Sequence, residues 1–212
     1  MATSRVTIVS GSGAHTDPWH DLDETSKALA GVLDGAPVVA TDVLASLDGI
    51  DVVVVNVSGD LARDPAESTV VVDALADHVA RGGGLVSVHS SALAFREDAR
   101  WRALMGGRWV PGVSGHPQIG RALVQATGAH AALPADFVVY DERYSALEVE
   151  PDAAVAAVHT EDGLTHPLVW TIERTANRGR VAYSALGHGV EAYESPNADV
   201  VRALVAWAAP ER

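Results

Sequence analysis

Short apolar runs that end in polar or glycine-rich loops recur along the first half of the chain. They lie at residues 5–10, 37–43, 51–57 and 85–89. Their length and β-branched composition predict strands. The run at 51–57 is apolar throughout most of its length, as expected for a central strand covered on both faces.

Two helix-like periodicities fall between these runs. Asp21 and Glu24 have the spacing of a capping box, for a helix that extends to about Leu33. A second helix begins near Pro65, and its apolar positions share one face. Because strands and helices alternate, the pattern predicts an α/β fold with a doubly wound sheet.

The second half of the chain is richer in strands. Further β-rich runs occupy residues 122–126, 137–145, 154–160, 167–173 and 180–186. Their short connections predict antiparallel strands added to a mostly parallel sheet. A last amphipathic helix follows, and since no break in composition divides the chain, we expect residues 1–212 to form one domain.

The composition of the chain limits the classes of partner that it can bind. The formal net charge of −13 disfavours nucleic acid and anionic membrane, since both require clustered Lys and Arg, whereas a small neutral ligand such as a sugar is compatible. No apolar run approaches the ~20 residues of a transmembrane helix, and the first residues do not resemble a signal peptide. We therefore expect a cytoplasmic protein; a homo-oligomer is left open.

Polar side chains follow several of the predicted strands, at the ends where open α/β sheets bind ligands. They are His15, Asp17, Trp19 and His20 after the first strand, Ser58 and Asp60 after the third, His89, Ser90 and Ser91 after the fourth, and His188 after the run at 180–186. If the fold is right, these side chains converge on one crevice.

Two histidines are candidates for chemistry. His89 directly ends a strand, where it can act as general base, proton donor or metal ligand, or can instead fasten the turn by a hydrogen bond. His188 lies between two glycines that let the backbone approach a ligand, the alternative being a simple turn residue. The other histidines that we interpret as structural or peripheral are His78, on a helix, and His130 and His159, at the surface or a sheet edge.

Asp141 and Glu142 are adjacent on a predicted strand and therefore point to opposite faces. Glu142 shares its predicted face with Tyr140 and Tyr144, which makes it an acid/base candidate, unless it makes only a structural hydrogen bond. Asp141 is expected to form a solvated ion pair with Arg143.

Metal and nucleotide motifs are missing from the sequence. There is no H-x-x-x-H or H-E-x-x-H spacing and no phosphate-binding loop. A site built from His89, His188 and Glu142, or with His20, would be assembled over long range, which spacing rules do not detect. A divalent metal suited to imidazole and carboxylate is therefore left open.

Aromatic rings are few and fall in predicted loops or at helix ends: Trp19, Trp101, Trp109 and Tyr193. Flat rings beside polar groups suit stacking on sugar faces. For Trp101 and Trp109 the alternative is that they close the core.

Five motifs in order carry a family resemblance: GGGLVSVHSS (82–91), W-x-x-L-M-G-G-R-W (101–109), DERYS (141–145), HPLVW (166–170) and GRVAYSALGHGVEAYESP (179–196). Together they resemble the trehalose-utilisation (ThuA-like) domain of the class I glutamine amidotransferase-like superfamily, over nearly the whole chain. The resemblance implies a flavodoxin-like fold and a link to disaccharide or keto-sugar metabolism. It also implies a degenerate amidotransferase site, with His89 where the amidotransferases hold their cysteine.

The expected function is that of a sugar-processing protein acting on a disaccharide, glycoside or keto-sugar. The expected catalytic residues are His89, Glu142 and His188, which match recurrent polar residues of the family. The residues expected to bind the sugar are His20, Trp19, Ser90, Tyr144 and Trp109. The chain has no cysteine, which excludes a glutaminase. Two alternatives remain: a non-catalytic sugar-binding or regulatory module, and a metal-dependent hydrolase.

Overall fold

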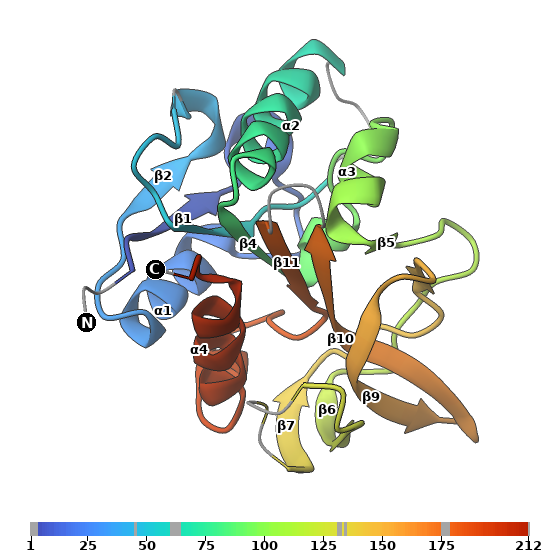
Figure 1. Cartoon of the computed structure of the whole chain (residues 1–212). Coiled ribbons are helices and arrows are strands. Elements are labelled where there is room, and N and C mark those ends of the chain that lie inside the picture. Colours follow the sequence, from blue (N-terminus) through green and yellow to red (C-terminus); the bar gives the residue numbers. More distant parts are fainter. Residues whose placement is uncertain are drawn as a thin grey trace.

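Helices cover both faces of a mixed β-sheet in the computed structural model of the chain (Figure 1). The structure describes residues 4–44, 46–59, 65–130, 133, 135–174 and 179–211. Asp60, which the sequence placed after the third strand, lies outside these residues. The described strands form a nine-stranded sheet and a separate two-stranded sheet.

The first half of the chain builds the parallel part of the large sheet. Its strands, in spatial order, are β2 (Val38–Ala40), β1 (Val6–Ser10), β3 (Val52–Asn56) and β4 (Gly84–Val88). The predicted second strand is too long, because Thr41–Val43 turn into a 3₁₀ helix. The Thr41 hydroxyl accepts the backbone N–H of Ser12, which ties this turn to the loop after β1.

The second half of the chain extends the sheet, mostly with antiparallel strands, as predicted. The strands, continuing from β4, are β11 (Gly179–Ser184), β10 (Leu164–Arg174), β9 (Ala154–Glu161), β6 (Gly120–Ala126) and β7 (Phe137–Asp141). β11 runs parallel to β4, and the others pair antiparallel. The two-stranded sheet consists of β5 (Gly107–Arg108) and β8 (Glu148–Val149). The mixed α/β architecture is thus that of a flavodoxin-like fold.

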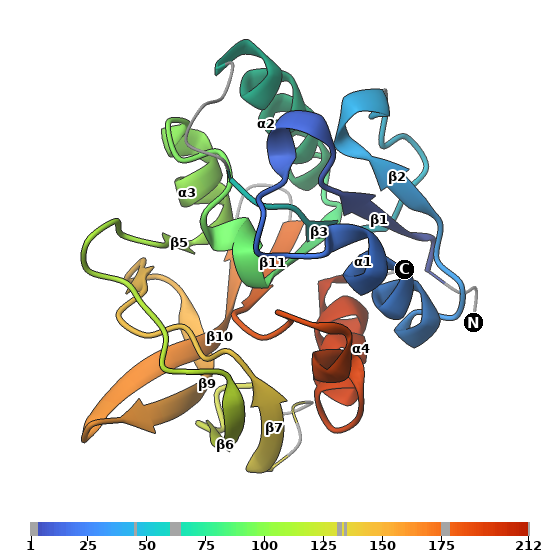
Figure 2. The ribbon, with the colours of Figure 1, turned by 180° about the vertical axis from the view of Figure 1, so that it is seen from behind.

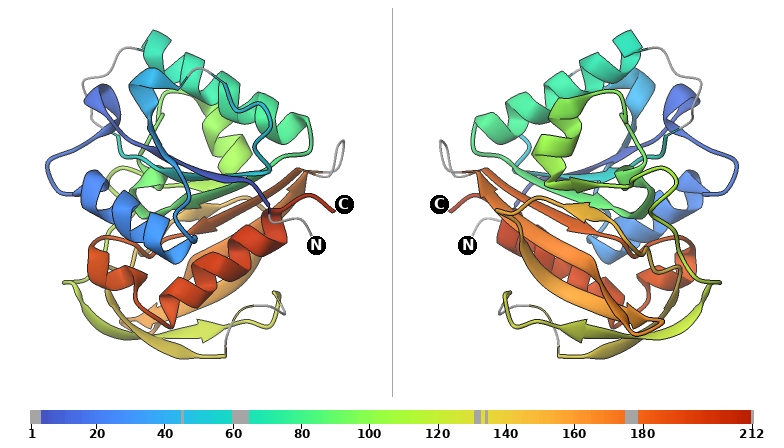
Figure 3. Two further views of the ribbon diagram at one scale, coloured as in Figure 1. Left: turned by 90° about the vertical axis from the view of Figure 1, so that its left-hand side faces the viewer. Right: turned by 90° about the vertical axis from the view of Figure 1, so that its right-hand side faces the viewer.

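The helices pack in pairs on the two faces of the sheet (Figure 3). One face carries α2 (Pro65–Ala80) and α3 (Ala99–Met105); the other carries α1 (Leu22–Val32) and α4 (Asn197–Ala208). Asp21 caps α1 by accepting the backbone N–H of Glu24, as the sequence predicted. In the view from behind, β6 and β7 lie below α4, at the end of the sheet opposite β2 (Figure 2).

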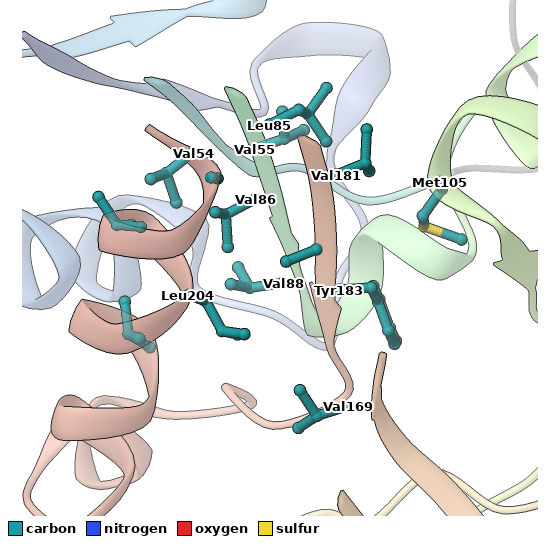
Figure 4. Packing of buried hydrophobic residues seen from close by; sticks show 14 of the residues in the cluster. Val54, Val55, Leu85, Val86, Val88, Met105, Val169, Val181, Tyr183 and Leu204 are labelled. Carbon is teal, nitrogen blue, oxygen red and sulfur yellow. The ribbon is translucent and has the colours of Figure 1, made fainter. Parts of the chain in front are cut away.

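The core lies between the parallel strands and the helices on each side. Val54, Val86 and Val88 are fully buried, and Leu204 of α4 packs over them (Figure 4). This burial on both faces is the physical reason why β3 and β4 have nearly continuous apolar sequences. No helix within the described residues is long and apolar enough to cross a membrane.

His78 has the structural role that the sequence indicated. It is buried near the end of α2, and its Nε2 lies 3.1 Å from the carbonyl oxygen of Gly84. Since a carbonyl only accepts, Nε2 carries the proton and donates it. The bond fixes the turn from α2 into β4, and β4 leads directly to His89.

Candidate functional site

His89 stands at a sharp turn at the carboxyl end of β4, as the sequence predicted. Its φ of +40° lies in the left-handed region, where residues with a side chain are uncommon. Its imidazole is buried, and Nδ1 donates a hydrogen bond of 2.8 Å to the carbonyl oxygen of Ala185, after β11. Tyr183 donates to the carbonyl oxygen of His89. With Nδ1 protonated in this way, Nε2 of His89 presents a lone pair.

His20 is oriented by a carboxylate. Nδ1 of His20 donates to Oδ2 of Asp17 over 2.7 Å, and the Ser58 hydroxyl donates to the same oxygen. The other oxygen of Asp17 accepts the backbone N–H groups of Trp19 and His20. Burial opposes ionisation of Asp17, but these hydrogen bonds outweigh it and lower its pKa. His20 therefore also presents the lone pair of Nε2.

Asp141 holds two loops of the site together. Its carboxylate accepts the backbone N–H groups of Gly187 (2.6 Å), His188 (3.1 Å) and Glu142 (2.8 Å). The expected solvated ion pair with Arg143 is wrong: Asp141 is only 1% exposed, and Arg143 pairs with Glu161. The expected strand at 137–145 also ends early, because the chain leaves β7 after Asp141. Burial raises the pKa of Asp141 to about 7 despite the three N–H donors.

The three histidines and Glu142 come together at one point. Oε2 of Glu142 lies 3.2 Å from Nδ1 of His188 and 3.7 Å from Nε2 of His89. The ring of His20 lies 5.0 Å, centroid to centroid, from the rings of both other histidines. One ring nitrogen from each histidine and one carboxylate oxygen of Glu142 all lie within 4.8 Å of one another. Of the side chains that the sequence placed in this crevice, His20, His89 and His188 therefore meet, together with Glu142.

The pKa values of the cluster are shifted in opposite directions. Burial lowers the pKa of His89 to about 4, so its ring is neutral near pH 7. The ion pair with Glu142 raises the pKa of His188. Burial disfavours the Glu142 carboxylate, but the contact with His188 outweighs burial and lowers its pKa. The cluster thus combines an ionised carboxylate, a neutral imidazole and an imidazole that favours the protonated form.

A pocket of about 410 Å³ opens over the cluster. Six of the expected site residues line it: Trp19, His20, Trp109, Glu142, Tyr144 and His188. Trp19 is 73% exposed, so its ring is free to contact a ligand. Tyr144 stacks on His89 with ring centroids 4.3 Å apart, and its edge meets Trp109.

Ser90 does not face this pocket, although the sequence placed it among the sugar-binding residues. Its side chain is buried, and its hydroxyl donates to the carbonyl oxygen of Val57. The hydroxyl of Ser91 is likewise buried and donates to Val55. Both serines fasten the turn after β4 to β3, so they supply neither a ligand donor nor a nucleophile in this arrangement.

Other expectations from the sequence are also corrected. His130 and His159 are not surface residues: His159 is 1% exposed, and its Nε2 donates to the carbonyl oxygen of Tyr144, while His130 packs against Trp207. Trp101 is buried in the core, where its indole N–H donates to the carbonyl oxygen of Ser91. Of the aromatic residues expected in loops, Trp19 and Trp109 line the pocket.

His116 belongs to the site, although no sequence pattern selected it. It lines the pocket, and its Nδ1 lies 3.6 Å from Oε1 of Glu142. His116 is part of a loop without periodicity, and its only signal is its place a few residues after Trp109. His15, in contrast, was placed at the crevice but is buried against Thr41.

Comparisons with known proteins identify the family of the chain. A family model described as trehalose utilisation (ThuA) matches residues 5–208, so the chain belongs to the ThuA family, which is associated with sugar utilisation. No curated protein matches the chain.

Solved structures show the same fold. A putative ThuA-like protein from Parabacteroides merdae is 15% identical, with a TM-score of 0.78 over 97% of this chain and 90% of that chain. One from Bacteroides uniformis is 16% identical, with a TM-score of 0.64 over 97% of this chain and 92% of that chain. A β-galactosidase from Rahnella sp. R3 is 16% identical, with a TM-score of 0.67 over 97% of this chain but only 31% of the enzyme.

Proposed function

We propose that the chain is a sugar-processing enzyme that acts on a disaccharide, glycoside or keto-sugar at the cluster of His20, His89, Glu142 and His188. The single observation that carries this proposal is the convergence of these four side chains at an aromatic-rimmed pocket, which His20, Glu142 and His188 line while His89 is buried beside them. Membership of the trehalose-utilisation family supports a sugar as the ligand.

The pocket has the chemistry that a neutral sugar requires. Its volume of about 410 Å³ lies within the ~300–1,000 Å³ of small-molecule sites. Trp19 and Trp109 offer flat apolar surfaces for the C–H faces of a sugar ring, while the cluster and His116 offer partners for its hydroxyl groups.

A second hollow of about 370 Å³ favours a ligand with two rings. It is lined by Trp101, Arg102 and Arg108 among others, and Trp109 belongs to the lining of both hollows. A disaccharide or glycoside that crosses Trp109 would place one ring at the cluster and the other in the second hollow.

The cluster supports acid–base chemistry on the bound sugar. Sites in which neighbouring groups have their pKa values pushed apart are typical of acid/base pairs. Here the neutral His89 and the ionised Glu142 would accept a proton, and His188, whose pKa Glu142 raises, would in its protonated form donate one to a departing or developing oxygen. Asp17 and Asp141 hold the participating residues in place.

The test is a screen of trehalose, other disaccharides, aryl glycosides and their 3-keto derivatives, with binding measured by calorimetry and products by NMR. We expect one class to bind and turn over, Glu142→Gln to abolish turnover, and Trp109→Ala to weaken binding of two-ring sugars more than of monosaccharides. Tyr140→Ala, an exposed aromatic on β7 outside the pocket, is the control and should change neither.

The outcomes separate the alternatives. Binding without turnover would favour the non-catalytic sugar-binding module over an enzyme. If no sugar binds, the proposal is wrong.

A further inference from the structure

Three buried ring nitrogens of the cluster face one another without any protein hydrogen-bond partner among the described residues. They are Nε2 of His20, Nε2 of His89 and Nδ1 of His188. Buried polar atoms are normally paired, because an unpaired one has given up its hydrogen bonds to water without replacement. Three such atoms aimed at one point, beside a carboxylate, need a common partner.

We propose that this partner is a divalent first-row transition metal ion, bound by His20, His89, His188 and Glu142. The proposal rests on the same site as the proposed function and specifies its cofactor, whichever sugar the site takes. With the ion bound, His89, His188 and Glu142 would be ligands, and a water on the ion would take over the acid–base role proposed for them.

The outer partners of two of the histidines fix the tautomers that a metal needs. His20 donates its Nδ1 proton to Asp17, and His89 donates its Nδ1 proton to the carbonyl oxygen of Ala185. Histidines that bind metals usually donate their second ring nitrogen to a carboxylate or carbonyl in this way, which orients the ring and leaves the ligating nitrogen unprotonated. Both patterns occur here, on histidines that follow different strands.

The spacing of the four donor atoms suits one ion. Donors about 2.0–2.2 Å from a central ion lie roughly 3–4 Å from one another. Oε2 of Glu142 is 3.2 Å from Nδ1 of His188 and 3.7 Å from Nε2 of His89, and all four donor atoms fall within 4.8 Å. Small rotations of the side chains would close this set around an ion.

The donor types select the class of metal. Three imidazoles and one carboxylate suit Zn²⁺, Fe²⁺, Co²⁺ or Ni²⁺, whereas Mg²⁺ and Ca²⁺ require mainly oxygen donors. The ionised carboxylates of Glu142 and Asp17 would offset the two positive charges. The ion would take the place of the ion pair between His188 and Glu142, and the pocket would give water or a sugar oxygen access to it.

The test uses the whole chain after removal of metal by a chelator. Isothermal titration with ZnCl₂ should give one site per chain, and CoCl₂ should give visible absorption bands typical of nitrogen and oxygen ligands. Zn²⁺ should also raise the melting temperature, since an ion that binds only the folded state stabilises it. MgCl₂ should give neither heat nor stabilisation.

Variants identify the ligands. Glu142→Gln and His20→Ala should each weaken Zn²⁺ binding by more than about 10–100-fold, the loss typical when a residue that only orients a ligand is substituted. His130→Gln, which alters a buried histidine outside the cluster, should bind Zn²⁺ as the parent does. Circular dichroism of each metal-free variant checks that it is folded, and if one is not, the other carries the test.

Failure of this inference is distinguishable from failure of the proposed function. If Zn²⁺ and Co²⁺ do not bind, or if Glu142→Gln and His20→Ala bind them like the parent, the metal site is wrong. Sugar turnover by metal-free protein would then leave the proposed function standing. If the metal binds as expected but no sugar binds or turns over, the metal site stands and the proposed function is wrong.

Discussion

His89 both fastens the turn after β4 and presents Nε2 to the cluster, and two substitutions can separate these roles. In His89→Ala both are lost. In His89→Asn the side-chain amide can still donate to the carbonyl oxygen of Ala185, and Asn tolerates the left-handed backbone better than Ala. Neither variant has a nitrogen lone pair where Nε2 stands.

The expected loss of stability follows from these contacts. His89→Ala leaves the buried carbonyl group of Ala185 without this donor, at about 1–3 kcal/mol, and places a residue with weak left-handed preference at φ +40°, at about 1 kcal/mol more. The sum is about 2–4 kcal/mol. For a chain of this length, 1 kcal/mol lowers the melting temperature by about 2–4 °C, so we expect a fall of roughly 5–15 °C. His89→Asn should lose about 1 kcal/mol or less.

The assay combines urea unfolding of both variants with titration of Zn²⁺ and of the sugar that the parent binds. We expect the two variants to differ in stability but to share the loss of metal affinity and turnover. Retention of metal affinity by His89→Asn would show that Nε2 is not a ligand. A His89→Ala variant within 0.5 kcal/mol of the parent would show that the bond to Ala185 contributes nothing.

Three further predictions test other parts of the account. Asp17→Asn places an amide N–H against Nδ1 of His20, which moves the ring proton to Nε2, the proposed ligand atom. Zn²⁺ affinity measured by calorimetry should therefore fall about 10–100-fold. An unchanged affinity would exclude His20 as a ligand. Burial lowers the pKa of His78 below its unfolded value of 6.5, so the unfolded chain binds the proton more readily and His78 costs stability as the pH falls below about 6.5. The stability of the parent relative to His78→Gln should therefore decline on acidification, and a difference independent of pH would contradict this. Gly31→Ala, on the open face of α1, should raise the unfolding free energy by about 1 kcal/mol. Gly107→Ala should lower it by about 1–3 kcal/mol, because the new Cβ would lie 2.6 Å from both the carbonyl oxygen of Glu148 and the ring of Trp170. Equal effects of the two variants in thermal unfolding would refute the packing argument.

The parts of the fold that the sequence predicted are those whose cause is local. β3 and β4 are buried on both faces, so nearly all of their residues had to be apolar. α1 begins where the Asp21 side chain accepts the backbone N–H of Glu24, only three residues away. The end of β7 has no such local cause. It depends on the contact of Asp141 with the backbone of Gly187, 46 residues away, and without that contact Asp141 looked like a solvated partner of Arg143.

The same distinction holds for the site. His89 and His188 could be selected because each ends or follows a recognisable strand, whereas Glu142 was selected for its face on a predicted strand that in fact ends at Asp141. His116 follows no such element, so nothing in its neighbourhood marked it. Ser90 was selected for its position beside His89, but the tight turn directs its hydroxyl back to Val57 instead of into the pocket.

The central claim is that three imidazoles and one carboxylate from distant segments form a single metal-binding centre at the pocket. Anomalous diffraction at the zinc edge, from crystals of the whole chain grown with ZnCl₂, tests it most directly. We predict one strong anomalous peak per chain, coordinated by Nε2 of His20, Nε2 of His89, Nδ1 of His188 and Oε2 of Glu142. An anomalous map without density between these four atoms, in crystals that contain zinc, would contradict the claim.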